Sequence, residues 1–290
     1  MNKKITLLFF AVFSFSGIYA QDDLLGLLEK DSLKQKDYVA ATFKATRIIN
    51  GHSVETPASG VLQFMILHRF GALNSGIYEL FGLDVANIRL GFDYGINSRL
   101  AVGIGRSGGD KTLDGYAKYK FLRQYDRMPL SLTFALASTY NFRRYDASAS
   151  RTDLQRLTYT YQALIARKFS QRFSLQLSPT WIYRNLTEST GEERNVLALG
   201  IGGRFKLTKR LALTSEYYYV LPDQIDPQYV NVLSVGVDIE TGGHVFQLHL
   251  TNGRNMVEPL FIAQNLGRWS KGEIYFGFNV SRAFVLKKKK

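Results

Sequence analysis

The residue types of a serine hydrolase occur on three neighbouring segments of the chain, at Glu216, Ser234 and His249. A catalytic triad needs its histidine between the acid and the serine, because the carboxylate orients the ring while the ring takes the hydroxyl proton. Pairing of the three segments as adjacent strands gives the order Glu216, Ser234, His249 instead. We therefore favour a non-catalytic polar cluster, and a hydrolase site near Ser234 and His249 stays as an alternative.

Other kinds of chemistry have weaker support in the sequence. Residues 103–108 spell GxGxxG, but no helix follows to point its N-terminus at a pyrophosphate, so a dinucleotide site is not expected. The chain has 4 histidines and no cysteine, and His244 and His249 would lie on opposite faces of one strand. We expect no metal, no cofactor and no nucleic-acid partner.

The element that positions Ser234 and His249 is predicted from the alternation in residues 236–250, GVDIETGGHVFQLHL. With Thr241 and Gly242 at the centre of a tight hairpin, one face of the strand pair is almost wholly apolar and the other is polar. The pairs expected on the apolar face are Ile239 with His244, Val237 with Phe246, Val235 with Leu248, and Leu233 with Leu250. A slip of one residue would exchange the two faces, so the alternation fixes which side chains share a face.

The same alternation continues from Val61 almost to the C-terminus and predicts an all-β fold. We predict twelve strands, at residues 61–70, 85–95, 99–106, 111–122, 129–143, 153–169, 172–185, 193–207, 210–221, 229–240, 244–252 and 272–285. Tight turns alternate with longer connections, and three of the tight turns carry the related motifs INSRLAVGI, FSQRFSLQL and LTKRLALTS. This asymmetry is typical of a single antiparallel transmembrane β-barrel. A soluble sandwich or lipocalin-like barrel would also alternate, but the strongly apolar face and the aromatic pairs near strand ends favour lipid contact.

The start of the chain predicts export. A basic start at Lys3 and Lys4, an apolar run and small residues up to Ala20 form a signal peptide cleaved after Ala20. Its removal takes two lysines, so the formal charge of +13 becomes 13 − 2 = +11. The chain holds no other apolar run of about 18 residues, which is the length of a spanning helix. We therefore expect a barrel in the outer membrane of a Gram-negative bacterium, surrounded by lipid and lipopolysaccharide.

Four regions follow: a signal peptide at 1–20, a periplasmic or plug segment at 21–60, a barrel at 61–286 and a basic tail at 287–290. Bacterial barrels have even strand numbers, so residues 39–50 are not expected in the wall. Phe43, Ile48 and Ile49 argue against a segment hanging in water. The leucines at 24–28 form one helical face, through which residues 21–37 could engage a periplasmic partner. The loop at 253–271 is too apolar for full solvation and is expected to fold onto the barrel mouth or inward.

Several segments resemble a known family. They are FKATRIINGHSVETP from Phe43, FGLDVANIRLGFDYGI from Phe81, EYYYVLPDQI from Glu216 and SVGVDIETGGHVFQLHLTN from Ser234. They are similar to a family of outer-membrane β-barrel proteins catalogued only as a domain of unknown function, over about Tyr38 to Leu286. The resemblance implies an outer-membrane barrel and supplies no substrate and no catalytic residues.

The interior of the predicted barrel holds the candidate functional residues, where basic groups outnumber acidic ones. The lumen or binding candidates are Arg69, Arg89, Asp93, Lys118, Arg156, Arg204, Glu216, Ser234, Asp238, Gln247 and His249. A small barrel can fill itself with paired charges of this kind. The leading hypothesis is a non-enzymatic one, a narrow channel or solute-binding transporter that favours small anionic solutes. A structural barrel that docks a periplasmic partner is a further alternative.

Overall fold

The computed structural model describes residues 37–109, 111–146, 150–187, 189, 191–241 and 244–287. The chain divides into two units, 1–37 and 38–290, and the second contains the fold described below. The signal peptide, the leucine face at 24–28 and most of the basic tail lie outside the described residues. None of the helices in the described part is long and apolar enough to cross a membrane.

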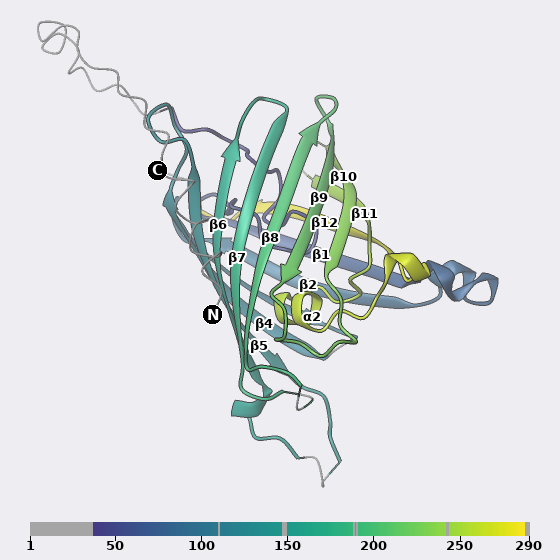
Figure 1. The fold of residues 1–290 in the computed structure, drawn as a ribbon. Helices are drawn as coiled ribbons and strands as arrows, with labels where there is room; N and C mark the ends of the chain where they lie inside the picture. Colours follow the sequence, from purple (N-terminus) through teal and green to yellow (C-terminus); the bar gives the residue numbers. More distant parts are fainter. Residues whose placement is uncertain are drawn as a thin grey trace, which may run out of the picture. The chain divides into compact units, whose positions relative to one another are not determined.

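Twelve antiparallel strands in this part of the chain form one closed barrel, in which each strand pairs with its neighbours in sequence and β1 pairs with β12 (Figure 1). The strands are β1 (Val61–Ala72), β2 (Ala86–Gly95), β3 (Leu100–Ser107), β4 (Thr112–Leu122), β5 (Ser131–Asn141), β6 (Leu157–Lys168), β7 (Phe173–Arg184), β8 (Asn195–Lys206), β9 (Leu211–Val220), β10 (Val232–Thr241), β11 (His244–Thr251) and β12 (Tyr275–Val285). The predicted fold class and strand count are confirmed.

The strands turn their apolar side chains outward and their polar side chains inward. On β2, Leu90 and Phe92 are 48% and 47% exposed, whereas Arg89 and Asp93, which flank them, are buried. A water-soluble barrel would reverse this arrangement. This arrangement is typical of barrels whose outer surface lies in lipid, and it accounts for the period-two pattern of the sequence.

The β10–β11 hairpin has the predicted faces but a different register. Ile239 lies opposite Phe246, not His244, and Thr241 lies opposite His244. The predicted turn centre was one residue too early. The residue opposite Ile239 is therefore two positions further along the chain than predicted, at Phe246 instead of His244. A shift of two leaves every side chain on its predicted face. His249 is accordingly buried inside, but it lies opposite Gly236, and Ser234 lies opposite Thr251.

The two ends of the barrel differ. One end, here called the turn end, holds the tight turns, and three of these use the motifs noted above. In each turn one side-chain oxygen accepts hydrogen bonds from the backbone amides two and three residues later. Asn97 accepts from Arg99 and Leu100, Ser170 from Arg172 and Phe173, and Thr208 from Arg210 and Leu211. These local bonds explain why Asn, Ser or Thr recurs at this position.

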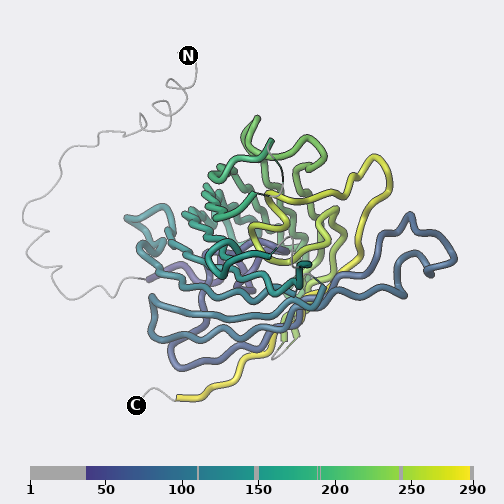
Figure 2. Tube along the Cα trace, turned by 90° about the horizontal axis from the view of Figure 1, so that it is seen from below, coloured from purple at the N-terminus to yellow at the C-terminus, as the bar shows by residue number. Residues whose placement is uncertain are grey.

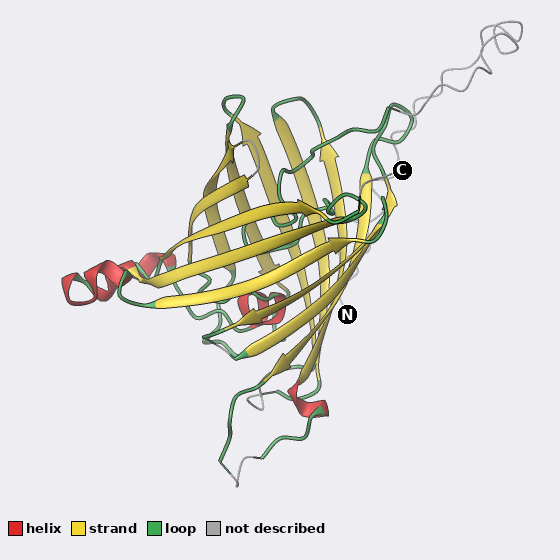
Figure 3. Ribbon diagram, turned by 180° about the vertical axis from the view of Figure 1, so that it is seen from behind, coloured by secondary structure: helices red, strands yellow, loops and turns green. Residues whose placement is uncertain are grey.

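The opposite end, here called the loop end, holds the longer connections and the short helices (Figure 3). These helices are η1 (Leu73–Ser75), η2 (Ile77–Gly82), η4 (Leu154–Arg156), α2 (Glu258–Ala263) and η5 (Trp269–Lys271). The α2 loop folds inward, and Met256, Val257, Phe261 and Ile262 are completely buried. From the turn end, residues 38–60 enter the barrel before β1 begins, and Figure 2 shows their purple trace running among the strands.

Candidate functional site

A short hairpin of residues 43–57 occupies the interior of the barrel. Arg47 and His52 form an antiparallel bridge, the amide of Ile48 donates to the carbonyl of Gly51 (2.9 Å), and the amide of Ser53 donates to the carbonyl of Thr46 (3.0 Å). The tip therefore lies at Ile49 and Asn50. Six consecutive residues from Arg47 to His52 are buried, so the tip lies deep in the lumen.

The carboxylate of Glu216 on β9 receives the hairpin tip. It accepts three consecutive backbone amides, from Ile49 (3.2 Å), Asn50 (2.7 Å) and Gly51 (3.2 Å). Consecutive amides that converge on one anion form a strong electrostatic site. Gly51 also packs against the hydroxyl of Tyr218, and a side chain at position 51 would collide with it. Position 51 therefore requires glycine because the Tyr218 side chain lies so close to it.

Ser234 is part of the same contact. The side-chain nitrogen of Asn50 donates to the Ser234 hydroxyl (2.9 Å), which donates to the hydroxyl of Thr251 (2.7 Å). Arg69 donates to the side-chain oxygen of Asn50 (2.7 Å). The Ser234 hydroxyl thus has partners on both sides, neither of them a histidine. The structure brings Glu216 and Ser234 together as predicted, opposite one another on β9 and β10, but it does not bring His249 to Ser234.

Wall side chains also bind the backbone of the hairpin along its length. The ammonium of Lys118 donates to the carbonyls of Thr46 (2.8 Å), Ser53 (2.9 Å) and Glu55 (3.1 Å). Gln176 accepts the amide of Val54 and donates to the carbonyl of His52, both at 2.7 Å. Gln247 and Asn279 donate to the carbonyls of Ile48 (2.7 Å) and Ile49 (2.8 Å). Backbone groups that could not remain unpaired inside a barrel are thereby satisfied.

The other predicted charges are paired. Arg89 bonds to Asp114 through two nitrogens, with Nε 2.8 Å from Oδ1. Arg204 lies 3.6 Å from Asp238 and 2.7 Å from Glu240. Asp93 accepts the hydroxyl of Thr46 (2.9 Å). The barrel therefore carries less free positive charge than the count of basic residues suggested.

Arg156 lies outside the strand predicted for it. β6 begins at Leu157, and Arg156 closes the η4 helix, where its guanidinium donates to the carbonyls of Asn141 (3.0 Å) and Arg143 (2.7 Å). The backbone amide of Thr152 donates to the side-chain oxygen of Gln155 (2.9 Å), and the backbone amide of Gln155 donates to the hydroxyl of Thr152 (3.4 Å). These reciprocal bonds start the helical turn. The local cap ends the extended backbone, so the predicted strand start at 153 was wrong.

The hairpin meets the α2 loop at a fully buried ion pair. The guanidinium of Arg47 lies 2.9 Å from the carboxylate of Glu258, and His52 lies 3.4 Å from the same oxygen. Burial among Arg47, Lys118 and Arg89 holds the pKa of His52 well below its usual range, chiefly through lost hydration, so the ring is neutral. Segments that enter from opposite ends of the barrel thus touch through charged and polar groups.

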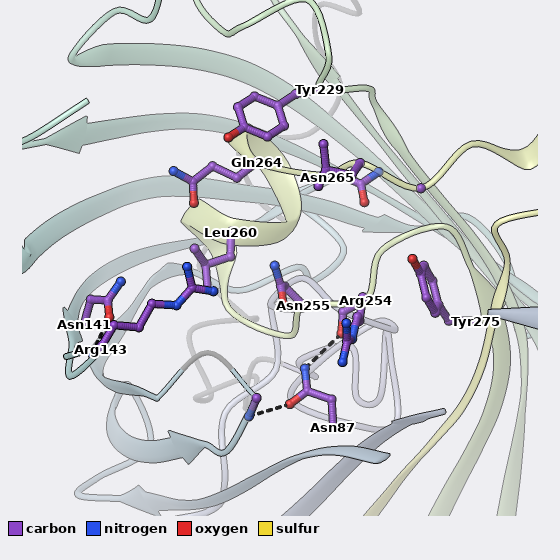
Figure 4. Close-up of a pocket in the computed structure, with 13 residues that line it drawn as sticks. Asn87, Asn141, Arg143, Tyr229, Arg254, Asn255, Leu260, Gln264, Asn265 and Tyr275 are labelled. Atoms are coloured by element: carbon purple, nitrogen blue, oxygen red, sulfur yellow. Dashed lines mark hydrogen bonds between the residues drawn. The ribbon is translucent and has the colours of Figure 1, made fainter. Parts of the chain in front are cut away.

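The described part of the barrel has a cavity at each end. The turn-end cavity has a volume of about 560 Å³ and lies between the hairpin and β1, β10, β11 and β12. The loop-end cavity, of about 370 Å³, is lined by residues of the α2 loop and by the loop-end residues of β2, β5 and β12 (Figure 4). The two cavities share no lining residue. In the described part of the chain, no group of three or more His, Asp or Glu is placed to hold a metal ion.

Sequence reasoning missed some residues of this interior. Asn279 lies on an inward position of β12 and could have been found from the alternation alone. The Asn50–Gly51 pair could have indicated a turn close to the hairpin tip, one residue from its actual centre. Glu258 gives no such signal, because only the folded α2 loop brings it to Arg47.

The fold is similar to that of solved outer-membrane porins. The NanC porin is 9% identical, with 76% of this chain and 98% of that chain covered and a TM-score of 0.50. The KdgM porin is 9% identical, with coverage of 77% and 99% and a TM-score of 0.48. An outer membrane channel from Pseudomonas putida F1 is 14% identical, with coverage of 79% and 97% and a TM-score of 0.45. Likeness at these identities concerns the fold alone.

A search of curated proteins gives no match to this chain. A protein family does match it, over residues 43–284, which include the inserted hairpin and nearly the whole barrel wall. The match confirms the family that the sequence resemblance indicated. The protein therefore belongs to the family described as a membrane bound beta barrel domain (DUF5777).

Proposed function

We propose that the protein is an outer-membrane channel or solute transporter whose passage the N-terminal hairpin closes. The observation that carries this proposal is the pair of cavities at opposite ends of one polar lumen, with the hairpin bound between them. Its export with a cleaved signal peptide belongs to the same proposal, and so does a periplasmic turn end, since short turns face the periplasm in barrels of this class.

The contacts of the hairpin are of a kind that can be released. Most are hydrogen bonds from wall side chains to hairpin backbone, as at Lys118, Gln176 and Glu216. Such bonds contribute about 0.5–1.5 kcal/mol each between neutral groups and about 1.5–3 kcal/mol where one partner is charged, because water offers both partners a replacement. A hydrated lumen would therefore keep the wall groups satisfied after the hairpin leaves.

Release of the hairpin would also change the charge that faces the passage. Lys118 would lose all three carbonyl partners and Arg69 would lose Asn50, while Glu216 would lose three amides. Glu258 would lose Arg47, and Asp93 would lose Thr46. Charges of both signs would then face the lumen at mid-depth, so the passage itself should discriminate weakly between anions and cations, which a reversal potential under a salt gradient would measure.

A reversible disulfide tests the gate directly, because the chain has no native cysteine. A Cβ atom at Gly202 would lie 3.5 and 3.6 Å from the γ carbons of Ile48, so Ile48→Cys with Gly202→Cys would place the two sulfur atoms within bonding reach. In planar bilayers we expect discrete openings under reducing conditions and a closed protein after oxidation. Ile48→Cys alone is the control and should respond to neither treatment.

Two results would overturn the proposal. Equal conductance in the oxidised and reduced double variant would show that the hairpin is not the gate. A folded variant that lacks residues 38–57 and still conducts no ion would remove the channel itself.

A further inference from the structure

The loop-end cavity has the composition of a binding site. Its lining includes two arginines, Arg143 and Arg254, the amides of Asn255 and Gln264, and the ring of Tyr275. No acidic residue lines it. A cavity of about 370 Å³ lies in the size range of sites for small molecules. Its charge favours an anion.

The amide side chains around the cavity divide into two sets. Asn87 accepts the amide of Gly109 (3.0 Å) and donates to the carbonyl of Arg254 (3.3 Å), while Asn265 donates to the carbonyl of Val230 (3.2 Å). These amides hold the loops in place. The side chains of Asn255 and Gln264 have no hydrogen-bond partner among the described residues, so their donors and acceptors stay available to a ligand.

The cavity also combines a cation with a ring surface. The backbone of Arg254 is fixed by Asn87, but its guanidinium is exposed and makes no hydrogen bond or ion pair with the described residues. In Figure 4, Arg143 lies on one side of the cavity and Arg254 and Tyr275 on the other, with Leu260 and Gln264 between them. A guanidinium binds a carboxylate or phosphoryl group through paired donors, and an aromatic ring packs against the C–H face of a sugar.

We propose that this cavity binds a small polyhydroxylated organic anion, either a sugar acid or a sugar phosphate. Arg254 contacts the anionic group, and the amides of Asn255 and Gln264 exchange hydrogen bonds with hydroxyl groups. This inference rests on the proposed function. It specifies the class of solute that binds at the loop end of the channel.

Equilibrium titration calorimetry on the full chain in detergent tests the site, with glucuronate, glucose 6-phosphate, glucose and acetate as probes. We expect glucuronate or glucose 6-phosphate to bind at least about tenfold more tightly than glucose and acetate, since one charge-assisted contact is worth about 1.4 kcal/mol or more. Comparison of glucuronate with glucose 6-phosphate decides between a carboxylate and a phosphoryl group.

Two variants locate the binding. Arg254→Met should weaken binding of the anionic sugar about tenfold or more, whereas Arg210→Met, an exposed arginine at the turn end, should leave it unchanged. Gln264→Leu should weaken the anionic sugar without improving acetate. A heat-modifiable band of the wild-type kind would show that each variant folds.

Three outcomes would overturn the inference: glucose that binds as tightly as the anions, acetate that binds as tightly as the sugars, or no binding of any probe. Binding in detergent does not depend on conduction. Absent binding with normal gating would therefore refute the site alone, and binding without any conductance would refute the channel alone.

Discussion

The two segments inside the barrel are held by different balances of polar and apolar contact. The hairpin is bound mainly through polar side chains of the wall, with Glu216 and Lys118 each making three bonds to its backbone. Its buried apolar residues Phe43, Ile48 and Val54 cluster with one wall residue, Ala166. The α2 helix is bound through apolar contacts. Phe261, Ile262 and Ala263 form one buried cluster with residues of the wall, namely Ile182, Val196, Ala198, Tyr218, Val220 and Val232.

This difference separates a releasable element from an anchored one. Water can replace the hydrogen bonds of the hairpin, so its release costs little per bond. Water offers no replacement for buried apolar surface, and exposure of a side chain such as Phe261 costs about 1.5–3 kcal/mol. We therefore expect the hairpin to leave the lumen while α2 stays.

The absence of native cysteine gives one common measurement of hairpin release. Val54 is 1% exposed inside the barrel, so Val54→Cys should react with a water-soluble maleimide only when the hairpin leaves. The labelling rate then reports the population of the released state. The predictions below use this variant as their background where hairpin release is the quantity measured.

The largest effect is expected at the anchored element. Phe261→Ala should lower the free energy of barrel unfolding by about 3–5 kcal/mol, because it leaves a cavity in the α2 cluster. Denaturant titration of the protein in detergent measures this change. Leu266→Ala, at a 56% exposed position of the same loop, should change it by less than about 0.5 kcal/mol. Equal effects at the two positions would show that α2 is not anchored by its apolar face.

A smaller effect is expected at the releasable element. Glu216→Gln replaces the carboxylate that accepts the three tip amides and should weaken docking by about 1.5–3 kcal/mol. Maleimide labelling of Val54→Cys should accelerate about tenfold to a hundredfold. Glu79→Gln, in η2 outside the barrel wall, is the matched control. An unchanged labelling rate in Glu216→Gln would show that this carboxylate does not stabilise the docked hairpin.

The smallest effect is expected from pH, through His52. The pKa of His52 is lowered in the docked hairpin and returns to about 6.5 in water, so the released state binds the proton more readily. The free energy that neutral His52 contributes to docking is fully present above about pH 7. It is lost as the pH falls below about 6.5, by up to about 1.4 kcal/mol per pH unit. The groups that face the ring are Arg47, Arg89, Tyr116, Lys118 and Glu258.

Acid should therefore accelerate labelling of Val54→Cys. The intrinsic thiol reactivity is corrected with the same cysteine in the unfolded protein. His52→Gln should remove most of this pH dependence. A dependence that persists in His52→Gln would assign the titration to another group.

The strands of the wall were predictable because a local pattern specifies which way their side chains face. Each strand repeats one rule, polar inward and apolar outward, so even the β10–β11 register error kept Phe246 outside and His249 inside. The interior contacts were not predictable in the same way. Asn50 bonds to Glu216, which is 166 residues away in the sequence, and Arg47 bonds to Glu258, which is 211 residues away. No local pattern specifies such pairs, since the closed wall must first bring the partners together.

The same long separations set an order of events for assembly. The hairpin precedes every wall strand in the chain, yet its partners lie on strands from β1 to β12, from Arg69 on the first to Asn279 on the last. Its binding pocket therefore does not exist until β1 has paired with β12. The first described part of the chain is thus the last to reach its native contacts, and docking of the hairpin would report that barrel closure is complete.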